Sequence, residues 1–190
     1  MNLPNKLTLL RIILAPIFLA LLIVDFPFHY IGALAVFIIA SLTDMIDGKL
    51  ARKYNLITDF GKFMDPLADK MLTTAAFIGF IELGLGYGIV WITMIVLTRE
   101  FLITSLRLSA ASAGTVIAAN IWGKAKTVAQ MVAIILTLTV LAIGELPALG
   151  GIAAIGKCAA AVTLWISAVL TVISGVIYMI DNGKFINTNK

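Results

Sequence analysis

The stretch DMIDGKLARKYNLITDFGKFMDPLAD, residues 44–69, lies between apolar segments and holds the acidic residues on which the interpretation of the whole chain depends. These residues are Asp44, Asp47, Asp65 and Asp69. An ionised aspartate near the centre of a bilayer costs roughly 2.5–3.5 kcal/mol, so four uncompensated ones would cost on the order of 10 kcal/mol. Divalent cations can offset this cost, because Mg²⁺ prefers oxygen ligands and keeps water ligands that a phosphate can replace.

The spacing at the beginning of the stretch fits one face of a helix. Positions 44, 47, 48 and 51 advance by three, one and three residues. Residues with this spacing share a face, so we expect the side chains of Asp44 and Asp47 to lie beside two small residues, Gly48 and Ala51.

The end of the stretch predicts a second acidic face. Asp65 and Asp69 form an i, i+4 pair. Gly61 lies one turn before Asp65 if the helix extends back that far, although Pro66 also allows a helix that begins near Asp65 as its cap. Two facing helices would bring the carboxylates together. Taken one at a time, each aspartate is better explained as an N-cap or a solvated loop charge.

The fixed positions of the stretch resemble the signature of the CDP-alcohol phosphotransferases, D-x2-D-G-x2-A-R-x8-G-x3-D-x3-D, at every one of its eight residues. Members of this family are integral membrane enzymes that split a CDP-linked lipid or alcohol, release CMP and join the remaining phosphoryl group to an acceptor hydroxyl. The resemblance implies an all-α membrane fold of this family, in a single domain over residues 1–190.

A metal site follows from the carboxylates and from the resemblance. Mg²⁺ or Mn²⁺, as two ions, would neutralise a pyrophosphate and stabilise charge during displacement at the lipid-linked phosphorus. The ligands would be Asp44, Asp47, Asp65 and Asp69. The resemblance further implies that Asp69 is the general base toward the acceptor hydroxyl.

The other signature residues are expected to contact the CDP-linked donor. Gly48 and Ala51 lack bulk, which would let the nucleotide approach the backbone closely; close helix packing through small residues is the alternative. Gly61 belongs to the same expected donor site. Arg52 could be a cation at the membrane interface, but its place in the signature favours contact with the nucleotide or a phosphate.

Composition independently indicates a membrane protein. Hydrophobic residues make up 61% of the chain, charged residues 13%, and the mean hydropathy is +1.07. Apolar stretches of transmembrane length recur throughout, so we predict a polytopic bundle of six transmembrane helices. Their expected ranges are 8–25, 31–52, 66–85, 88–109, 122–144 and 153–180. The last is long enough to tilt or to extend past the bilayer.

The basic residues predict the orientation of these helices. All but Lys157 fall at the termini or near the second-to-third and fourth-to-fifth connections, whereas the opposite turns hold acidic residues and His29. The positive-inside rule therefore predicts that both termini and the aspartates face the cytoplasm. The net charge of +4 then reflects orientation and attraction to anionic headgroups, and we expect no nucleic acid as a partner.

The acceptor is suggested by residues outside the signature. The segments LPNKLTLLR at 3–11, REF at 99–101 and GKAKT at 123–127 resemble the bacterial members of the family that make phosphatidylglycerophosphate. Arginine suits a phosphate because its planar fork donates two parallel hydrogen bonds. The expected acceptor-phosphate residues are Thr8, Arg11, Arg99, Arg107 and Lys126. Any one of the cations could instead anchor a helix at headgroups, and Arg99 could pair with a neighbouring acid.

The resemblance implies transfer of a phosphatidyl group from CDP-diacylglycerol to glycerol 3-phosphate, giving phosphatidylglycerophosphate and CMP. A cardiolipin synthase of the same family, with phosphatidylglycerol as acceptor, is the alternative. A small ion transporter is a remote alternative. It would need acidic groups near the membrane midplane and an inverted repeat, whereas the aspartates are expected to cluster toward one side and no duplicated half is detectable.

Several smaller expectations complete the interpretation. We expect a bacterial plasma-membrane protein without a cleavable signal peptide, and the resemblance suggests a homodimer. Cys158 is expected to be a buried structural thiol, and an intramolecular disulfide is impossible because it is the single cysteine. His29 is expected to be an interfacial residue without a second metal ligand near it.

Overall fold

The computed structural model describes residues 3–53, 59–112 and 120–183. These residues form six α-helices and one short 3₁₀ helix, with no strand among them. The elements are α1 (Leu3–Ile23), α2 (His29–Lys53), α3 (Asp59–Glu82), α4 (Ile89–Ser112), α5 (Ile121–Gly144), η1 (Pro147–Leu149) and α6 (Gly150–Asn182). The all-α prediction is therefore confirmed for the described residues.

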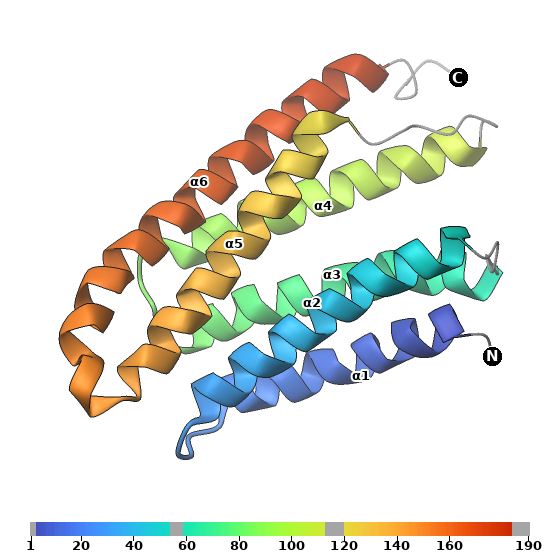
Figure 1. Cartoon of the computed structure of the whole chain (residues 1–190). Coiled ribbons are helices and arrows are strands. Elements are labelled where there is room, and N and C mark those ends of the chain that lie inside the picture. The colour runs from blue at the N-terminus through green and yellow to red at the C-terminus, as the bar shows by residue number, and fades with distance from the viewer. Residues whose placement is uncertain (1–2, 54–58, 113–119, 184–190) are drawn as a thin grey trace.

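The helices alternate in direction, so α1, α3 and α5 begin at the end of the bundle where α2, α4 and α6 finish (Figure 1). Both termini lie at this end, which we call the terminal end; the opposite end holds the short turns. Helix α1 packs against α2 and α3, and α6 packs against α4 and α5. Contacts of α5 with α2 and of α3 with α4 join the two groups.

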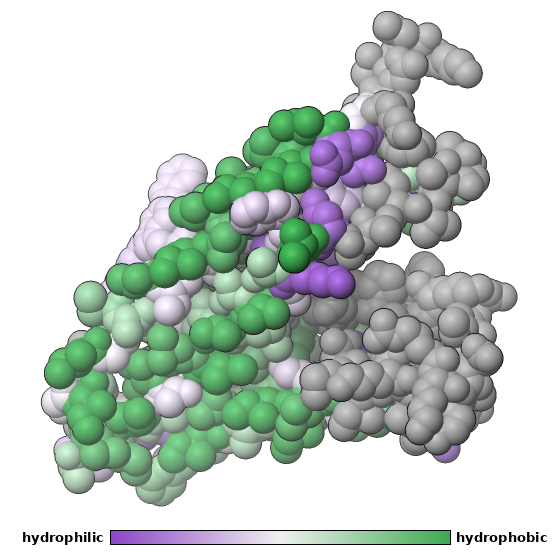
Figure 2. Space-filling view, turned by 45° about the horizontal axis from the view of Figure 1, so that its top comes forward, coloured by the Kyte–Doolittle hydropathy of each residue, from purple (hydrophilic) through white to green (hydrophobic). Residues whose placement is uncertain are grey.

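Four helical segments among the described residues are long and apolar enough to cross a membrane. They are Asn5–Ile23, Ile89–Ala111, Ile121–Gly144 and Gly151–Asn182. His29–Thr43 is a shorter apolar helix. A membrane protein is thus supported, while the number of six spans stays a prediction. In the space-filling view most of the described surface is hydrophobic, and the largest group of strongly hydrophilic residues lies toward the terminal end (Figure 2).

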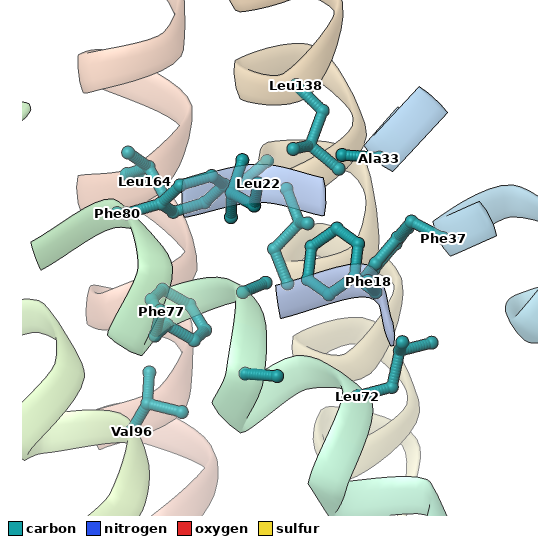
Figure 3. Close-up of a cluster of buried hydrophobic side chains, with 14 of the residues drawn as sticks. Phe18, Leu22, Ala33, Phe37, Leu72, Phe77, Phe80, Val96, Leu138 and Leu164 are labelled. Carbon is teal, nitrogen blue, oxygen red and sulfur yellow. The ribbon is translucent and has the colours of Figure 1, made fainter. Parts of the chain in front are cut away.

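The core draws side chains from all six α-helices (Figure 3). Phe18 of α1 packs against Phe37 of α2 with ring centroids 5.4 Å apart, and Phe77 and Phe80 of α3 meet edge to face at 6.4 Å. Such tilted aromatic pairs add specific geometry to simple packing. Leu22 of α1, which is labelled in Figure 3, is fully buried as well.

Gly79 lets α3 approach α1 closely. A Cβ atom at this position would lie 2.4 Å from Cδ2 and 3.2 Å from Cγ of Leu22, which is itself fully buried. We expect Gly79→Ala to lower the melting temperature in detergent, because overpacking of this kind typically costs about 1–3 kcal/mol. Gly32→Ala is the matched control, since its Cβ would lie 3.9 Å from Leu21. Equal melting temperatures for the two variants would contradict this account.

Two contacts tie separate elements together at the end opposite the termini. The carboxylate of Glu145, just after α5, accepts hydrogen bonds from the backbone N–H groups of Tyr30 and Ile31, each at 3.3 Å. Glu145 therefore satisfies donors at the start of α2 that have no partner within the helix. Trp165 Nε1 donates to the carbonyl of Tyr87 at 2.8 Å and joins α6 to the turn between α3 and α4.

One expectation about a single residue is wrong, and another is wrong in part. Cys158 is exposed on α6 rather than buried, because it lies on a face of the helix that is not covered by the described residues. His29 is buried, with its Nδ1 atom 3.1 Å from the carbonyl of Leu21, and acids do lie near it. Its Nε2 atom is 3.7 Å from Glu145 and 3.8 Å from Asp25. The turn folds back, so residues distant in sequence surround the imidazole.

Candidate active site at the terminal end

The signature residues occupy the ends of two consecutive helices. The second half of α2 holds Asp44, Asp47, Gly48, Ala51 and Arg52. Gly61, Asp65 and Asp69 fall within the first half of α3. Both parts lie at the terminal end (Figure 1), and the convergence of their two acidic faces stays a prediction. The side chains of these residues lie outside the described part of the structure.

The start of α3 resolves one alternative that the sequence left open. The helix begins at Asp59, so Gly61 is helical and lies one turn before Asp65. Pro66 is then the eighth residue of the helix, and not its opening residue. Membrane helices tolerate such prolines because neighbouring groups can satisfy the freed backbone carbonyl.

Helix α1 presents a buried stripe that changes from polar to apolar along its length. Asn5, Thr8 and Arg11 are 7%, 1% and 2% exposed, and they recur every three residues from the terminal end. Ala15 and Phe18 continue the stripe into the core. Three hydrogen-bonding side chains, one of them charged, are thus held inside the protein at the end where the signature lies.

Helix α5 repeats this pattern. Its first turn is capped by Asn120, whose side chain accepts a hydrogen bond from the N–H of Gly123 at 2.8 Å. Lys126 and Gln130 follow on the buried face and are 4% and 3% exposed, and the same face then continues with apolar Ala133. A buried ammonium is rare in proteins unless a counter-charge accompanies it.

That counter-charge is Glu100 of α4. Its Oε1 atom accepts a hydrogen bond from Nζ of Lys126 and a second, at 3.1 Å, from Nη1 of Arg99. Nη2 of Arg99 donates to the hydroxyl of Ser174 on α6 at 2.7 Å. Glu100 and its two cations therefore link α4, α5 and α6. Arg99 thus pairs with a neighbouring acid, as in the alternative that the sequence left open.

A third cation reaches the same part of α4 from α3. Nζ of Lys70 donates to the hydroxyl of Thr104 at 2.7 Å, and this hydroxyl donates in turn to the carbonyl of Glu100 at 2.6 Å. Lys70 follows Asp69 directly in sequence. The network thus connects the helix that carries Asp65 and Asp69 with the helix that carries Glu100.

Arg107 lies apart from this network in the described contacts. Its Nε atom donates to the hydroxyl of Tyr178 at 3.0 Å, and its guanidinium carbon lies 5.5 Å from the centre of the Tyr178 ring. Tyr178 is buried on α6, whereas Arg107 is exposed. The buried tyrosine therefore contacts the guanidinium group of an exposed arginine through both its hydroxyl and its ring.

The structure thus brings together Lys126 and Arg99 of the predicted acceptor set, and it buries Thr8 and Arg11 at the same end. Sequence reasoning assigned no site role to Glu100 or Lys70. Glu100 could have been suspected, because it is an acid between Arg99 and an apolar residue inside a long apolar helix. Lys70 gave no such signal. Among the described residues, no group of three or more His, Cys, Asp or Glu side chains is arranged so that it could hold a metal ion.

Acidic helix ends beside buried cations, at one end of an apolar bundle, are typical of a membrane enzyme that handles phosphate esters. The chain matches the CDP-alcohol phosphatidyltransferase family over residues 1–173. It therefore belongs to this family.

Three relatives illustrate how far the similarity extends. The chain is 40% identical to a CDP-diacylglycerol–glycerol-3-phosphate 3-phosphatidyltransferase of Bacillus subtilis, over 99% of this chain and 98% of the relative. It is 42% identical to a probable phosphatidylglycerophosphate synthase of Mycobacterium tuberculosis, over 94% and 80%. It is 36% identical to a CDP-diacylglycerol–glycerol-3-phosphate 3-phosphatidyltransferase of Rickettsia bellii, over 93% of each chain.

Proposed function

We propose that this chain transfers a phosphatidyl group from CDP-diacylglycerol to glycerol 3-phosphate and releases CMP. The observation that carries the proposal is the position of two buried cations, Arg11 and Lys126, at the same end of the bundle as the signature helices. A lipid-linked donor alone would not require cations on α1 and α5. A small acceptor that carries its own phosphate would, and nearly full-length relatives are named for such an acceptor.

The donor set of the signature fits Mg²⁺ or Mn²⁺. All four acidic positions offer oxygen ligands, two from α2 and two from α3, and hard divalent cations prefer such ligands. Asp44, Asp47, Asp65 and Asp69 would hold two ions, which when bound would supply positive charge to the pyrophosphate of the donor.

The side chains of the protein would transfer the proton and hold both substrates. Asp69 would take the proton of the acceptor hydroxyl, whose oxygen then attacks the lipid-linked phosphorus. The bond from this phosphorus to the oxygen of CMP breaks, and CMP leaves. Arg52 and the small residues Gly48, Ala51 and Gly61 would bind the nucleotide. Arg11 and Lys126 would hold the phosphate of the acceptor, so that its hydroxyl lies in line with the reacting phosphorus.

The decisive experiment measures CMP release by the purified chain in detergent with CDP-diacylglycerol and one acceptor at a time. Glycerol 3-phosphate, phosphatidylglycerol, serine and inositol phosphate are compared in parallel. We expect rapid release only with glycerol 3-phosphate, loss of release with a chelator and recovery with Mg²⁺. Preference for phosphatidylglycerol would instead identify a cardiolipin synthase, and no CMP release with any acceptor would refute the proposal.

The active site is proposed to face the cytoplasm, with both termini, in a bacterial plasma membrane. Single cysteines at Asp181 and Asp25, in a Cys158→Ala background, test this orientation because both positions are exposed and lie at opposite ends of the bundle. A reagent that does not cross the membrane should label Asp25→Cys in intact cells and Asp181→Cys only after lysis. The reverse pattern would overturn the orientation. The homodimer implied by the resemblance stays a prediction.

A further inference from the structure

Glu100 places a negative charge at a site that is proposed to receive a negatively charged phosphate. Its carboxylate is 17% exposed and lies directly between Lys126 and Arg99, two of the cations expected to attract the acceptor. A carboxylate repels a phosphate, so a carboxylate at this position needs a reason other than direct binding of the acceptor.

The ammonium group of Lys126 is buried and needs a partner of opposite charge. Its side chain is 5% exposed, so few water molecules can solvate the ammonium. Lysine also has a long, flexible stem that can place its charge in many positions. A hydrogen-bonded carboxylate stabilises the charged form of such a buried ammonium and restricts where the nitrogen lies.

Glu100 is itself held in place by neighbouring side chains. Arg99 donates to its carboxylate and is anchored in turn by Ser174 of α6. Gly175 leaves room for this arrangement, because a Cβ atom there would lie 3.2 Å from Cγ of Arg99. Thr104 bonds to the carbonyl of Glu100 and receives Lys70 from α3. Arg99, anchored by Ser174 of α6, therefore holds the carboxylate of Glu100, while Thr104, with Lys70 bound to it, contacts the backbone carbonyl of the same residue.

The charged residues around Glu100 keep a net positive charge. Lys70, Arg99 and Lys126 contribute three positive charges and Glu100 one negative charge, so the group keeps a net charge of +2. An anionic acceptor is still attracted, although one carboxylate stands inside the group.

We propose that Glu100 is a positioning residue for the acceptor, acting through Lys126 rather than by contact with the substrate. It holds the ammonium of Lys126 at the place where the phosphate of glycerol 3-phosphate docks, and it links that place to α4 and α6. This inference rests on the proposed function.

A double-mutant cycle on the full-length purified enzyme tests the inference. The variants are Glu100→Gln, Lys126→Met and the two together, and kcat and KM are measured for each substrate with the other at saturation. We expect Glu100→Gln to lower kcat/KM for glycerol 3-phosphate about tenfold, mainly through KM, with the KM for CDP-diacylglycerol changed by less than about twofold. The double variant should lie within about threefold of Lys126→Met alone.

Two further variants separate positioning from loss of structure. Glu100→Asp keeps the charge but withdraws it by one methylene, and it should recover part of the loss; it also decides the matter if Glu100→Gln does not fold. Glu82→Gln removes an exposed carboxylate at the opposite end of α3 and should behave as wild type.

Effects of Glu100→Gln and Lys126→Met that multiply independently, or equal losses for both substrates, would overturn the inference. So would a fall in KM for glycerol 3-phosphate in Glu100→Gln, because the carboxylate would then compete with the acceptor. A wild-type enzyme whose CMP release does not depend on glycerol 3-phosphate would remove the proposed function, and this inference with it. The wild-type control therefore distinguishes the two failures.

Discussion

Replacing Asp69 with asparagine is expected to lower kcat by about a hundredfold to ten-thousandfold, the range associated with loss of a general acid or base. The variant loses a proposed metal ligand and the proposed base at once, while the amide keeps nearly the same size. Steady-state CMP release at saturating CDP-diacylglycerol and glycerol 3-phosphate measures the effect. Asp44→Asn and Asp65→Asn should be similarly severe, because each removes a ligand from the same site.

The matched control for this series is Asp181→Asn. Asp181 is exposed near the end of α6, at the same end of the bundle, so its replacement makes the same chemical change without touching the signature. We expect wild-type activity from it. Retention of more than about a tenth of kcat by Asp69→Asn, a loss below about 1.4 kcal/mol, would rule out its assignment as general base.

Replacing either buried cation with alanine is expected to lower kcat/KM for glycerol 3-phosphate about tenfold to a hundredfold. A charge-assisted hydrogen bond to a partly buried phosphate is worth roughly 1.5–3 kcal/mol, which corresponds to this range. Arg11→Ala tests α1 and Lys126→Ala tests α5. The KM for CDP-diacylglycerol should change little in both, since the donor is proposed to bind on α2 and α3.

Each buried cation has an exposed neighbour that serves as its control. Lys6 lies on α1 and Lys124 on α5, both exposed at the terminal end. If basic residues at this end only anchor helices at anionic headgroups, all four alanine variants should change acceptor kinetics by less than about threefold, as expected for about 1 kcal/mol or less per interfacial cation. A difference between buried and exposed cations assigns the effect to the acceptor site.

The fold could be predicted largely from composition, because long apolar segments separated by short polar turns have few alternatives to a helical bundle. Helix starts were less predictable. The expected third helix begins at residue 66, whereas α3 begins at Asp59. A proline is common in the first turn of a helix, so Pro66 favours the later start in the sequence. The expected first helix begins at residue 8, whereas α1 begins at Leu3. Polar residues near the helix start, Asn5 and Lys6, explain why the apolar pattern misses these first five residues, about one and a half turns.

The site was predictable only where the residues are close in sequence. Signature spacing places the aspartates on α2 and α3, but no spacing rule relates Glu100 to Lys126, which lie 26 residues apart on different helices. The same holds for Arg107 and Tyr178, at a separation of 71 residues. Burial also separates Lys126 from Lys124, although both fall in one short basic segment. These distinctions depend on how helices rotate against one another, which periodicity alone does not specify.

The polar stripe of α1 has a consequence for where the two substrates meet. Arg11 lies eight residues from the start of the helix, about 12 Å along its axis, and the stripe is apolar from Ala15 onward. The hydrocarbon core of a bilayer is about 30 Å thick. Along α1 the protein therefore offers buried hydrophilic side chains only over about 12 Å from the terminal end, a depth comparable to the headgroup layer of one leaflet. A charged metabolite can reach that depth from water, and a lipid can place its phosphate there while its acyl chains stay in the hydrocarbon core. The water-soluble acceptor therefore does not have to enter the hydrocarbon core, and the lipid donor does not have to leave the membrane.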